Sequence, residues 1–213
     1  MINILTLVFS DFQINTYIVY DQTNECVIID PGCYYSEEET ILKETIKTKN
    51  LKPVHLLNTH THLDHVFGNK FVSDTFNLGS EACFEDEVVL NSFEFATNRY
   101  GLTTNKPYSI KKYLKEGDII KFGNSELEVL EVPGHTPGHL AFVNRNEKIA
   151  FVGDVLFSNS IGRTDLPGGN HKQLIESIKN KLYTLPEETV VYSGHGPTTS
   201  IEKEKCSNPF VKQ

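Results

Sequence analysis

The stretch NTHTHLDHVFGN, residues 58–69, crowds three histidines and one aspartate into six positions. Imidazole and carboxylate groups suit zinc or iron, so this crowding predicts a metal site. One local cluster of four ligands is too strained to serve a single ion fully, and we therefore expect two neighbouring sites completed by distant residues. The ligand candidates within the stretch are His60, His62, Asp64 and His65.

Three further ligand candidates occur later in the chain, each after a run of residues that favours a β-strand. They are His135 in PGHTPGH, Asp154 in FVGDVLF and His195 in SGHGP. A carboxylate has two oxygens and can bridge two metal ions, whereas a neutral imidazole cannot, so we expect Asp154 to lie between the ions. The predicted set contains five histidines and two aspartates.

Strands and helices must alternate along the chain to position these residues. Val54–Asn58 is predicted as a strand that ends directly before the histidine cluster, at a junction of the kind that commonly carries function. Ser36 and the acidic run Glu37–Glu39 fit a capping box that opens a helix ending near Asn50. The other predicted strands are Asn3–Phe9, Asn15–Tyr20, Glu25–Asp30, Asp118–Phe122, Ser125–Val132, His139–Asn144, Lys148–Gly153 and Val190–Ser193. The other predicted helical regions are Ser80–Tyr100 and Lys172–Leu182.

The predicted elements are β-rich and then helical, twice. Each half contains a hairpin whose second strand ends in an aspartate, Asp30 or Asp154. This repetition predicts an α+β fold in which two sheets pack face to face with helices outside, an αββα sandwich. We expect residues 1–213 to form a single domain, with all seven ligand candidates at one edge between the sheets.

Composition narrows the class of partner. The chain has 213 residues, 38% hydrophobic content and a formal net charge of −8, which argues against binding to nucleic acid or to an anionic membrane surface. No apolar run approaches the roughly 18 residues that span a bilayer, and no targeting segment is evident, so we expect a cytoplasmic protein. The four cysteines show no CxxC pair and suggest neither a disulfide framework nor a thiolate zinc site. A small-molecule substrate is the expected partner.

At the ligand candidates the sequence resembles the metallo-β-lactamase superfamily. The resemblance is to its glyoxalase II-like branch, in which the pattern THxHxDH is followed by a later histidine, a later aspartate and a C-terminal histidine. Two further segments, SIGRTDLPGG (residues 160–169) and GHGPTTSIEKEKCSNPF (residues 194–210), are similar to the short stand-alone members of that branch. The likeness covers almost the whole chain and implies the four-layer αββα metallo-β-lactamase fold.

The resemblance also implies a centre of two divalent ions, with zinc the first choice and iron or manganese the alternatives. By position, one ion is held by His60, His62 and His135, the other by Asp64, His65 and His195, and Asp154 bridges them. Two adjacent metals lower the pKa of bound water from about 15.7 toward roughly 7 and polarise the electrophile. We expect a metal-bridging hydroxide as the nucleophile and Asp64 as the catalytic residue that orients it and accepts its proton.

The implied activity is hydrolysis of an S-2-hydroxyacyl thioester such as S-lactoylglutathione. A thioester suits this site because a thiolate leaves without strong help from a general acid. Longer members of the branch have a C-terminal helical domain that supplies basic residues to glutathione, whereas this chain ends 18 residues after His195. We therefore expect an open cleft and weak selectivity for the thiol.

Other functions fit the same motifs. The sulfur dioxygenases on this scaffold hold one iron through two histidines and one aspartate and oxidise glutathione persulfide; the corresponding residues here are His60, His135 and Asp154. Lactonase or β-lactamase activity is a third possibility, and a non-catalytic metal-binding module is a fourth. The physiological substrate and the oligomeric state are left open.

Several polar residues near the motifs have a structural and a functional interpretation. Asp30 either orients a ligand imidazole through its free N–H or caps a turn. Arg163 either holds a substrate carboxylate or pairs with Asp165 to brace its loop. Thr59 and Thr61 are expected to stiffen the histidine loop.

Three histidines fall outside the predicted metal set. His55 alternates with apolar neighbours on a predicted strand and is expected to be packed or hydrogen-bonded in place. His139 follows the PGH loop and is expected to make a structural hydrogen bond, with support of a metal ligand as the alternative. His171 is expected on the surface at the start of a helix.

Overall fold

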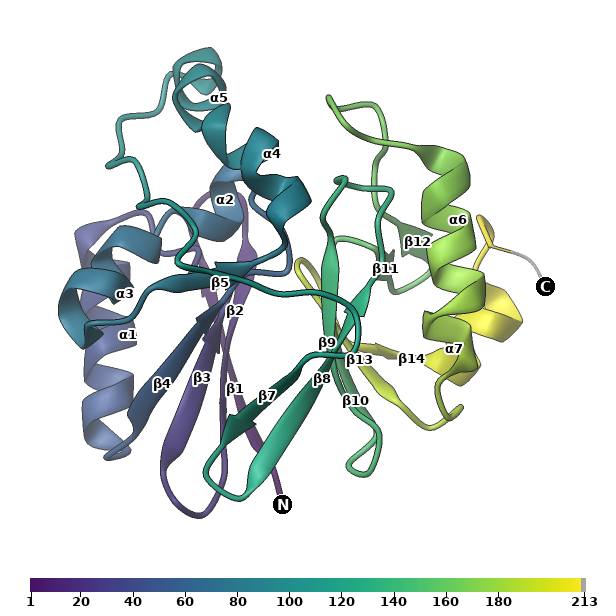
Figure 1. The fold of residues 1–213 in the computed structure, drawn as a ribbon, viewed down its shortest axis with the longest axis horizontal. Helices are drawn as coiled ribbons and strands as arrows, with labels where there is room; N and C mark the ends of the chain where they lie inside the picture. The colour runs from purple at the N-terminus through teal and green to yellow at the C-terminus, as the bar shows by residue number, and fades with distance from the viewer. Residues whose placement is uncertain (212–213) are drawn as a thin grey trace.

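Two six-stranded sheets pack face to face in the computed structural model, which describes residues 1–211 (Figure 1). The first sheet has the order β1 (Asn3–Phe9), β2 (Ile14–Tyr20), β3 (Glu25–Ile29), β4 (Lys52–Leu57), β5 (Ser80–Ala82) and β6 (Lys112–Tyr113). The second sheet has the order β14 (Thr199–Ser200), β13 (Val190–Ser193), β10 (Ile149–Gly153), β9 (Leu140–Asn144), β8 (Ser125–Glu131) and β7 (Ile119–Phe122). A separate short hairpin joins β11 (Leu156–Phe157) to β12 (Ser160–Ile161).

Both sheets combine antiparallel hairpins with parallel pairs. In the first sheet, β1, β2 and β3 are antiparallel neighbours, whereas β3 to β6 run parallel. In the second sheet, β7 to β10 are antiparallel neighbours and β10 runs parallel to β13. Parallel strands end at the same edge of a sheet, and this edge is where the residues of interest lie.

Helices cover the outer faces of both sheets. Figure 1 shows α1 (Ser36–Thr48) and α3 (Asn69–Phe76) outside the first sheet, and α6 (His171–Asn180) and α7 (Ile201–Ser207) outside the second. The short helices α2 (Leu63–Val66), α4 (Glu87–Asn91) and α5 (Phe93–Tyr100) lie near the upper edge of the first sheet in that view. The expected four-layer αββα sandwich is therefore confirmed. Among the described residues, no helix is both long and apolar enough to cross a membrane.

The alternation of side chains along each strand divides the apolar residues among three layers. In β3, Val27 and Ile29 face the second sheet, while Cys26 and Ile28 face the outer helices. The layer between the sheets includes Tyr17, Val19, Leu57, Phe122, Leu127, Val129, Phe142 and Phe151. The two outer layers pack against the helices, the first through Leu42, Ile46 and Val72 and the second through Leu174, Ile178 and Ile201. Burial on both faces of each sheet stabilises this arrangement and fixes the positions of the strand ends.

The structure corrects three expectations. The region Ser80–Tyr100 is not one helical stretch: Ser80–Ala82 forms β5, which is buried and pairs in parallel with β4 and β6, and a 3₁₀ turn at Phe84–Asp86 precedes α4 and α5. Pairing within the sheet outweighs the helical preference of Glu and Ala in so short a segment. Helix α7, within the segment similar to stand-alone relatives, was not predicted as a helix.

The start of α1 also differs from the prediction. Ser36 is the first helical residue rather than the cap, and Tyr35 occupies the N-cap position. The Glu38 carboxylate accepts the backbone N–H groups of Tyr34 at 2.8 Å and Tyr35 at 3.1 Å. Glu38 therefore provides the carboxylate contact of a capping box to the N-cap residue, with the cap one residue earlier than expected. The four cysteines are free thiols, and only Cys206 is exposed.

Candidate metal centre

The ligand candidates lie where parallel strands end. His60 follows β4, Asp154 directly follows β10 and His195 follows β13. Two backbone contacts connect the two sheets at this edge: Ile14 forms an isolated bridge with His195, and the Asn15 N–H donates to the carbonyl of Gly194 at 2.7 Å. The topology therefore brings segments far apart in the sequence to one site.

The structure brings together all seven residues that the sequence singled out. They form three overlapping groups in which one nitrogen or oxygen of each residue lies within 4.8 Å of the others. The groups are His60, His62 and His135; His60, His65 and Asp154; and Asp64, His65 and His195. Their binding of two ions remains a prediction, but such a cluster is capable of holding metal.

Asp154 is central to the cluster. One of its oxygens, Oδ1, lies 3.5 Å from His65 Nε2. The other, Oδ2, lies 3.7 Å from His135 Nε2 and 3.5 Å from His195 Nε2. The carboxylate thus faces histidines from both predicted ligand triads, which is the position that a bridging group requires.

Buried atoms without partners show that the cluster fits a cation. His60 Nε2, His65 Nε2 and Asp154 Oδ1 are buried and have no hydrogen-bond partner among the described residues. An unpaired buried polar group costs about 1–3 kcal/mol, so three together in one cluster indicate a missing partner. Gly194 allows this crowding, because a Cβ at that position would lie 2.2 Å from Asp154 Oδ1.

Hydrogen bonds to the far ring nitrogens determine which nitrogen of each histidine faces the cluster. His135 Nδ1 lies 2.8 Å from the carbonyl of Arg163, and His195 Nδ1 lies 3.0 Å from that of Phe12. A carbonyl only accepts, so these contacts assign the proton to Nδ1 and leave the Nε2 lone pair free. Both histidines thereby direct Nε2 toward the cluster.

Asp30 plays the same part for His65. Its Oδ2 accepts from His65 Nδ1 at 3.0 Å and from the Thr59 hydroxyl at 2.6 Å, and its Oδ1 accepts the Thr59 N–H at 2.8 Å. Of the two interpretations of Asp30, orientation of an imidazole is therefore the one that the structure shows. The same contacts confirm that Thr59 stiffens the histidine loop.

The electrostatic environment of His60, His62 and Asp154 favours the forms of these side chains that bind metal. Burial and the neighbouring histidines hold the pKa of His60 well below its usual range. Burial together with His135 lowers the pKa of His62 to about 3. Burial opposes ionisation of Asp154, yet His65 and the other histidines lower the pKa of this carboxyl below its usual range. Neutral imidazoles and an ionised carboxylate are the forms that bind divalent metals.

A buried carboxylate that sequence reasoning missed, Asp86, joins two ligand loops. Its Oδ2 accepts the Thr61 N–H at 2.8 Å, its Oδ1 accepts the Gly138 N–H at 2.7 Å, and its carbonyl accepts the Thr61 hydroxyl at 2.8 Å. The loop of His60 is thus tied to the loop of His135. Asp86 ends the 3₁₀ turn after β5. No sequence signal pointed to it, because this region was predicted to be helical.

The three other histidines have the structural roles that were predicted. His139 Nε2 accepts the N–H of Asp154 at 3.1 Å, and its ring stacks on His60 with centroids 4.6 Å apart. His55 is hydrogen-bonded on both sides, by Glu81 and by the carbonyl of Lys121. His171 is exposed as the first residue of α6.

Arg163 braces its own loop. Its guanidinium forms two parallel hydrogen bonds with Asp165, at 2.8 and 2.7 Å, and its carbonyl accepts from His135. The pairing with Asp165 that the sequence suggested is confirmed. The segment around Arg163 therefore helps to position a ligand candidate.

A cavity of about 940 Å³ opens onto the cluster. It is lined by His62, Asp64, His135, Asp154 and His195 and by residues of α4, α5 and the 163–168 segment. A site of this size can enclose a small molecule next to the cluster.

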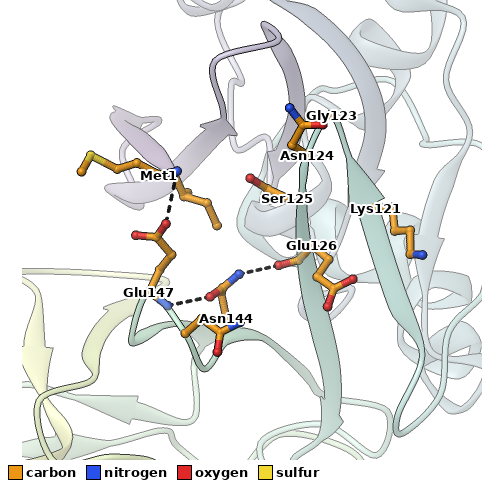
Figure 2. A pocket seen from close by; sticks show the side chains of 10 residues that line it. Met1, Lys121, Gly123, Asn124, Ser125, Glu126, Asn144 and Glu147 are labelled. Atoms are coloured by element: carbon orange, nitrogen blue, oxygen red, sulfur yellow. Dashed lines mark hydrogen bonds and ion pairs between the residues drawn. The ribbon is translucent and has the colours of Figure 1, made fainter.

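A second cavity, of about 410 Å³, offers no comparable chemistry (Figure 2). It lies by the β7–β8 and β9–β10 turns, and among its lining residues there is no histidine and no cysteine. The amino group of Met1 pairs there with Glu147 at 3.3 Å, and the side chain of Asn144 donates to the carbonyl of Glu126 at 2.8 Å. These contacts connect the β9–β10 turn to the chain start and to β8, at the end of the sheets opposite the ligand candidates.

Comparisons with known proteins identify the family of the chain. Residues 10–195 match a family model described as the metallo-beta-lactamase superfamily. The chain is 37% identical over 213 residues to hydroxyacylglutathione hydrolase GloC of Haemophilus influenzae, covering 98% of each protein.

Solved structures also superpose on the chain. A B3 metallo-beta-lactamase, BLEG-1, superposes with a TM-score of 0.90 at 34% identity over the whole of both chains. TTHA1623 in a di-iron-bound form superposes with a TM-score of 0.87 at 36% identity, covering 97% of this chain and 100% of that one. The chain therefore belongs to the metallo-beta-lactamase superfamily.

Proposed function

We propose that the protein is a binuclear metal-dependent hydrolase of the glyoxalase II type that cleaves S-2-hydroxyacyl thioesters such as S-lactoylglutathione. The observation that carries the proposal is the complete pair of ligand triads around Asp154, with the distances given above. The relative named hydroxyacylglutathione hydrolase supports the choice of a thioester.

In this proposal each of the two triads would hold one ion, and Asp154 would be shared by both. The triads are His60, His62 and His135, and Asp64, His65 and His195. Bound divalent ions would supply Lewis acidity, lowering the pKa of water toward roughly 7 and polarising the acyl oxygen. Zinc is the first choice, and iron is a real alternative because a relative of 36% identity is described in a di-iron-bound form.

Asp64 is the proposed proton acceptor. Asp64 lines the cavity, and its Oδ2 lies 3.3 Å from His195 Nε2. Burial opposes ionisation, yet His65 and the contact with His195 keep the pKa of Asp64 below its usual range. The ionised carboxylate can orient an attacking water and take its proton at Oδ.

Neither the two buried thiols of Cys26 and Cys83 nor the serine that lines the cavity is activated as a nucleophile that could compete with water. Burial raises the pKa of Cys26 and of Cys83 to about 12, so neither thiol ionises near neutral pH. Ser92, which lines the cavity, donates its hydroxyl to the carbonyl of Val89 rather than to a base. Direct attack by water on the acyl carbon therefore suits this site, and a thiolate can leave without a strong acid.

The test combines metal analysis with a substrate panel. Protein purified without added metal is analysed for its elements and then assayed anaerobically with S-lactoylglutathione and related thioesters. We expect about two ions per chain and hydrolysis that needs no oxygen. One iron per chain, no anaerobic turnover, and oxygen consumption with glutathione persulfide would instead establish the dioxygenase alternative.

A second candidate, β-lactam hydrolysis, is favoured by one observation, the 34% identity to a B3 metallo-beta-lactamase. A β-lactam has an amide nitrogen as leaving group, which needs a proton, whereas a thiolate does not. We therefore expect kcat/KM for S-lactoylglutathione to exceed that for a chromogenic cephalosporin. The reverse order would make β-lactam hydrolysis the principal activity.

A further inference from the structure

One wall of the cavity carries large apolar side chains that solvent reaches. Val88 is 64% exposed, Phe95 72% and Tyr100 52%, and all three line the 940 Å³ cavity. We refer to these three residues as the α4–α5 wall. Clustered exposed apolar side chains mark binding surfaces more often than scattered ones do. Figure 1 shows α4 and α5 near the upper edge of the first sheet, and the cavity that the α4–α5 wall lines also contains the ligand candidates His135, Asp154 and His195.

Two arginines line the cavity, and they differ in whether another protein group already binds them. Arg163 is engaged by Asp165. Arg99, in the last turn of α5, also lines the cavity, and its guanidinium makes no hydrogen bond or ion pair within residues 1–211. The cavity thus combines an apolar surface with one arginine, Arg99, that has no ion-pair partner within residues 1–211.

We propose that the α4–α5 wall binds an aromatic or branched aliphatic group of the substrate while Arg99 attracts a carboxylate of the same molecule. The inference rests on the proposed function, because it names the class of thioester that the same site accepts. The apolar group can belong to the acyl part or to the thiol part, and the experiment distinguishes these two sources.

The physical reason is the removal of apolar surface from water. A phenyl ring that replaces a methyl group at this wall would cover side chains that are otherwise more than half exposed. Burial of apolar area stabilises a complex by about 25 cal/mol per Å², and partial burial of a ring corresponds to roughly tenfold tighter binding. An exposed arginine adds less, about threefold, because water and salt screen its charge.

The experiment uses probes that cannot be hydrolysed, so that it does not depend on turnover. Calorimetry on the metal-loaded protein compares mandelate with lactate for the acyl part, and S-methyl-N-benzoylcysteine with S-methyl-N-acetylcysteine for the thiol part. In the unaltered protein, one of these pairs is expected to show about tenfold tighter binding of the phenyl-bearing member. The variants Phe95→Ala and Val88→Ala, combined, should reduce that ratio below about twofold.

Phe84→Ala is the matched control. Phe84 is 57% exposed and belongs to the turn before α4, but its ring packs on Tyr113 and does not line the cavity. It should leave the ratio unchanged. Arg99→Ala should weaken both members of the affected pair by about threefold without altering their ratio, and unchanged affinities would refute the role of the arginine.

The α4–α5 wall has no such role if neither pair shows a preference, or if the combined Phe95→Ala and Val88→Ala substitutions leave the preference intact. It also fails if these substitutions abolish self-association in sedimentation experiments while probe binding is unaffected, because the wall would then contact a second copy. Failure of the proposed function is separate: a protein that prefers the phenyl-bearing probes but hydrolyses no thioester retains this binding surface and is not a thioesterase.

Discussion

At the residue scale, the site depends on groups that hold the outer ring nitrogen of a histidine, which are backbone carbonyls for His135 and His195 and a carboxylate for His65. Asp30 holds His65 Nδ1 at 3.0 Å, so that Nε2 faces Asp154. In Asp30→Asn the amide can still form one hydrogen bond but lacks the charge that favours this orientation. We expect metal affinity at the Asp64, His65 and His195 triad to fall by about 10- to 100-fold.

Competition with a chromophoric chelator measures that affinity. Asp74→Asn is a suitable control, because Asp74 is an exposed carboxylate paired with Lys70 on α3 and does not contact the cluster. Equal dissociation constants for Asp30→Asn and the unaltered protein would show that Asp30 does not support the ligand.

If each triad holds its own ion, substitution of a residue in one triad should remove only that ion. His60 belongs to the triad with His62 and His135, and His65 to the triad with Asp64 and His195. His60→Ala and His65→Ala should therefore each lower the metal content by about one ion per chain, as measured by elemental analysis. Loss of both ions in each variant would indicate a cooperative centre, and loss of neither would refute the ligand assignment.

At the element scale, Asp86 couples the loop after β4 to the loop before β9. An amide in its place presents an NH₂ group to one of the two backbone donors, Thr61 N–H or Gly138 N–H, and leaves it unpaired. Asp86→Asn should weaken metal binding at the His60, His62 and His135 triad by about tenfold or more, because the two loops that carry its ligands are no longer held together.

Asp21 provides a matched control for that experiment. It is also a buried carboxylate that joins segments of the two sheets, but at their other end, where it accepts from Thr23, Asn124 and Ser125. Asp21→Asn should lower the melting temperature and leave the metal dissociation constants unchanged. If Asp86→Asn affects only the melting temperature, as Asp21→Asn is expected to, its proposed role in metal binding is wrong.

The elements also show what the sequence can and cannot predict. The ligand candidates could be identified from the sequence because short spacing and strand ends are local features, as His60, His62 and Asp154 illustrate. Strand β5 was missed because the composition of Ser80–Ala82 favours a helix, and only pairing with β4 and β6 makes it a strand. Asp86 was missed with it, since its function arises from contacts with Thr61 and Gly138 that the local sequence does not encode.

At the scale of the whole molecule, the site requires the two sheets to keep their relative position. Burial opposes ionisation of Asp21, but hydrogen bonds from Thr23, Asn124 and Ser125 hold its pKa below the usual value. A carboxyl whose pKa is lower in the folded state stabilises the fold at pH values above its unfolded pKa of about 3.9. This contribution is lost as the pH falls through the pKa of the folded state. The free energy of unfolding should therefore differ between the unaltered protein and Asp21→Asn at pH 7.

That difference should shrink as the pH is lowered to 3 and below. Chemical denaturation of both proteins across this range measures it. A difference that stays constant, or grows toward acid pH, would show that the ionised Asp21 carboxylate does not stabilise the contact between the sheets.

The central claim is that two ions in one chain support thioester hydrolysis without oxygen. Its most direct test is a titration of metal-free protein with Zn²⁺ under argon, while hydrolysis of S-lactoylglutathione is followed continuously. The account predicts that activity rises through the second equivalent and is constant beyond about two ions per chain. Activity that is complete at one equivalent, or that is absent until iron and oxygen are supplied, would contradict it.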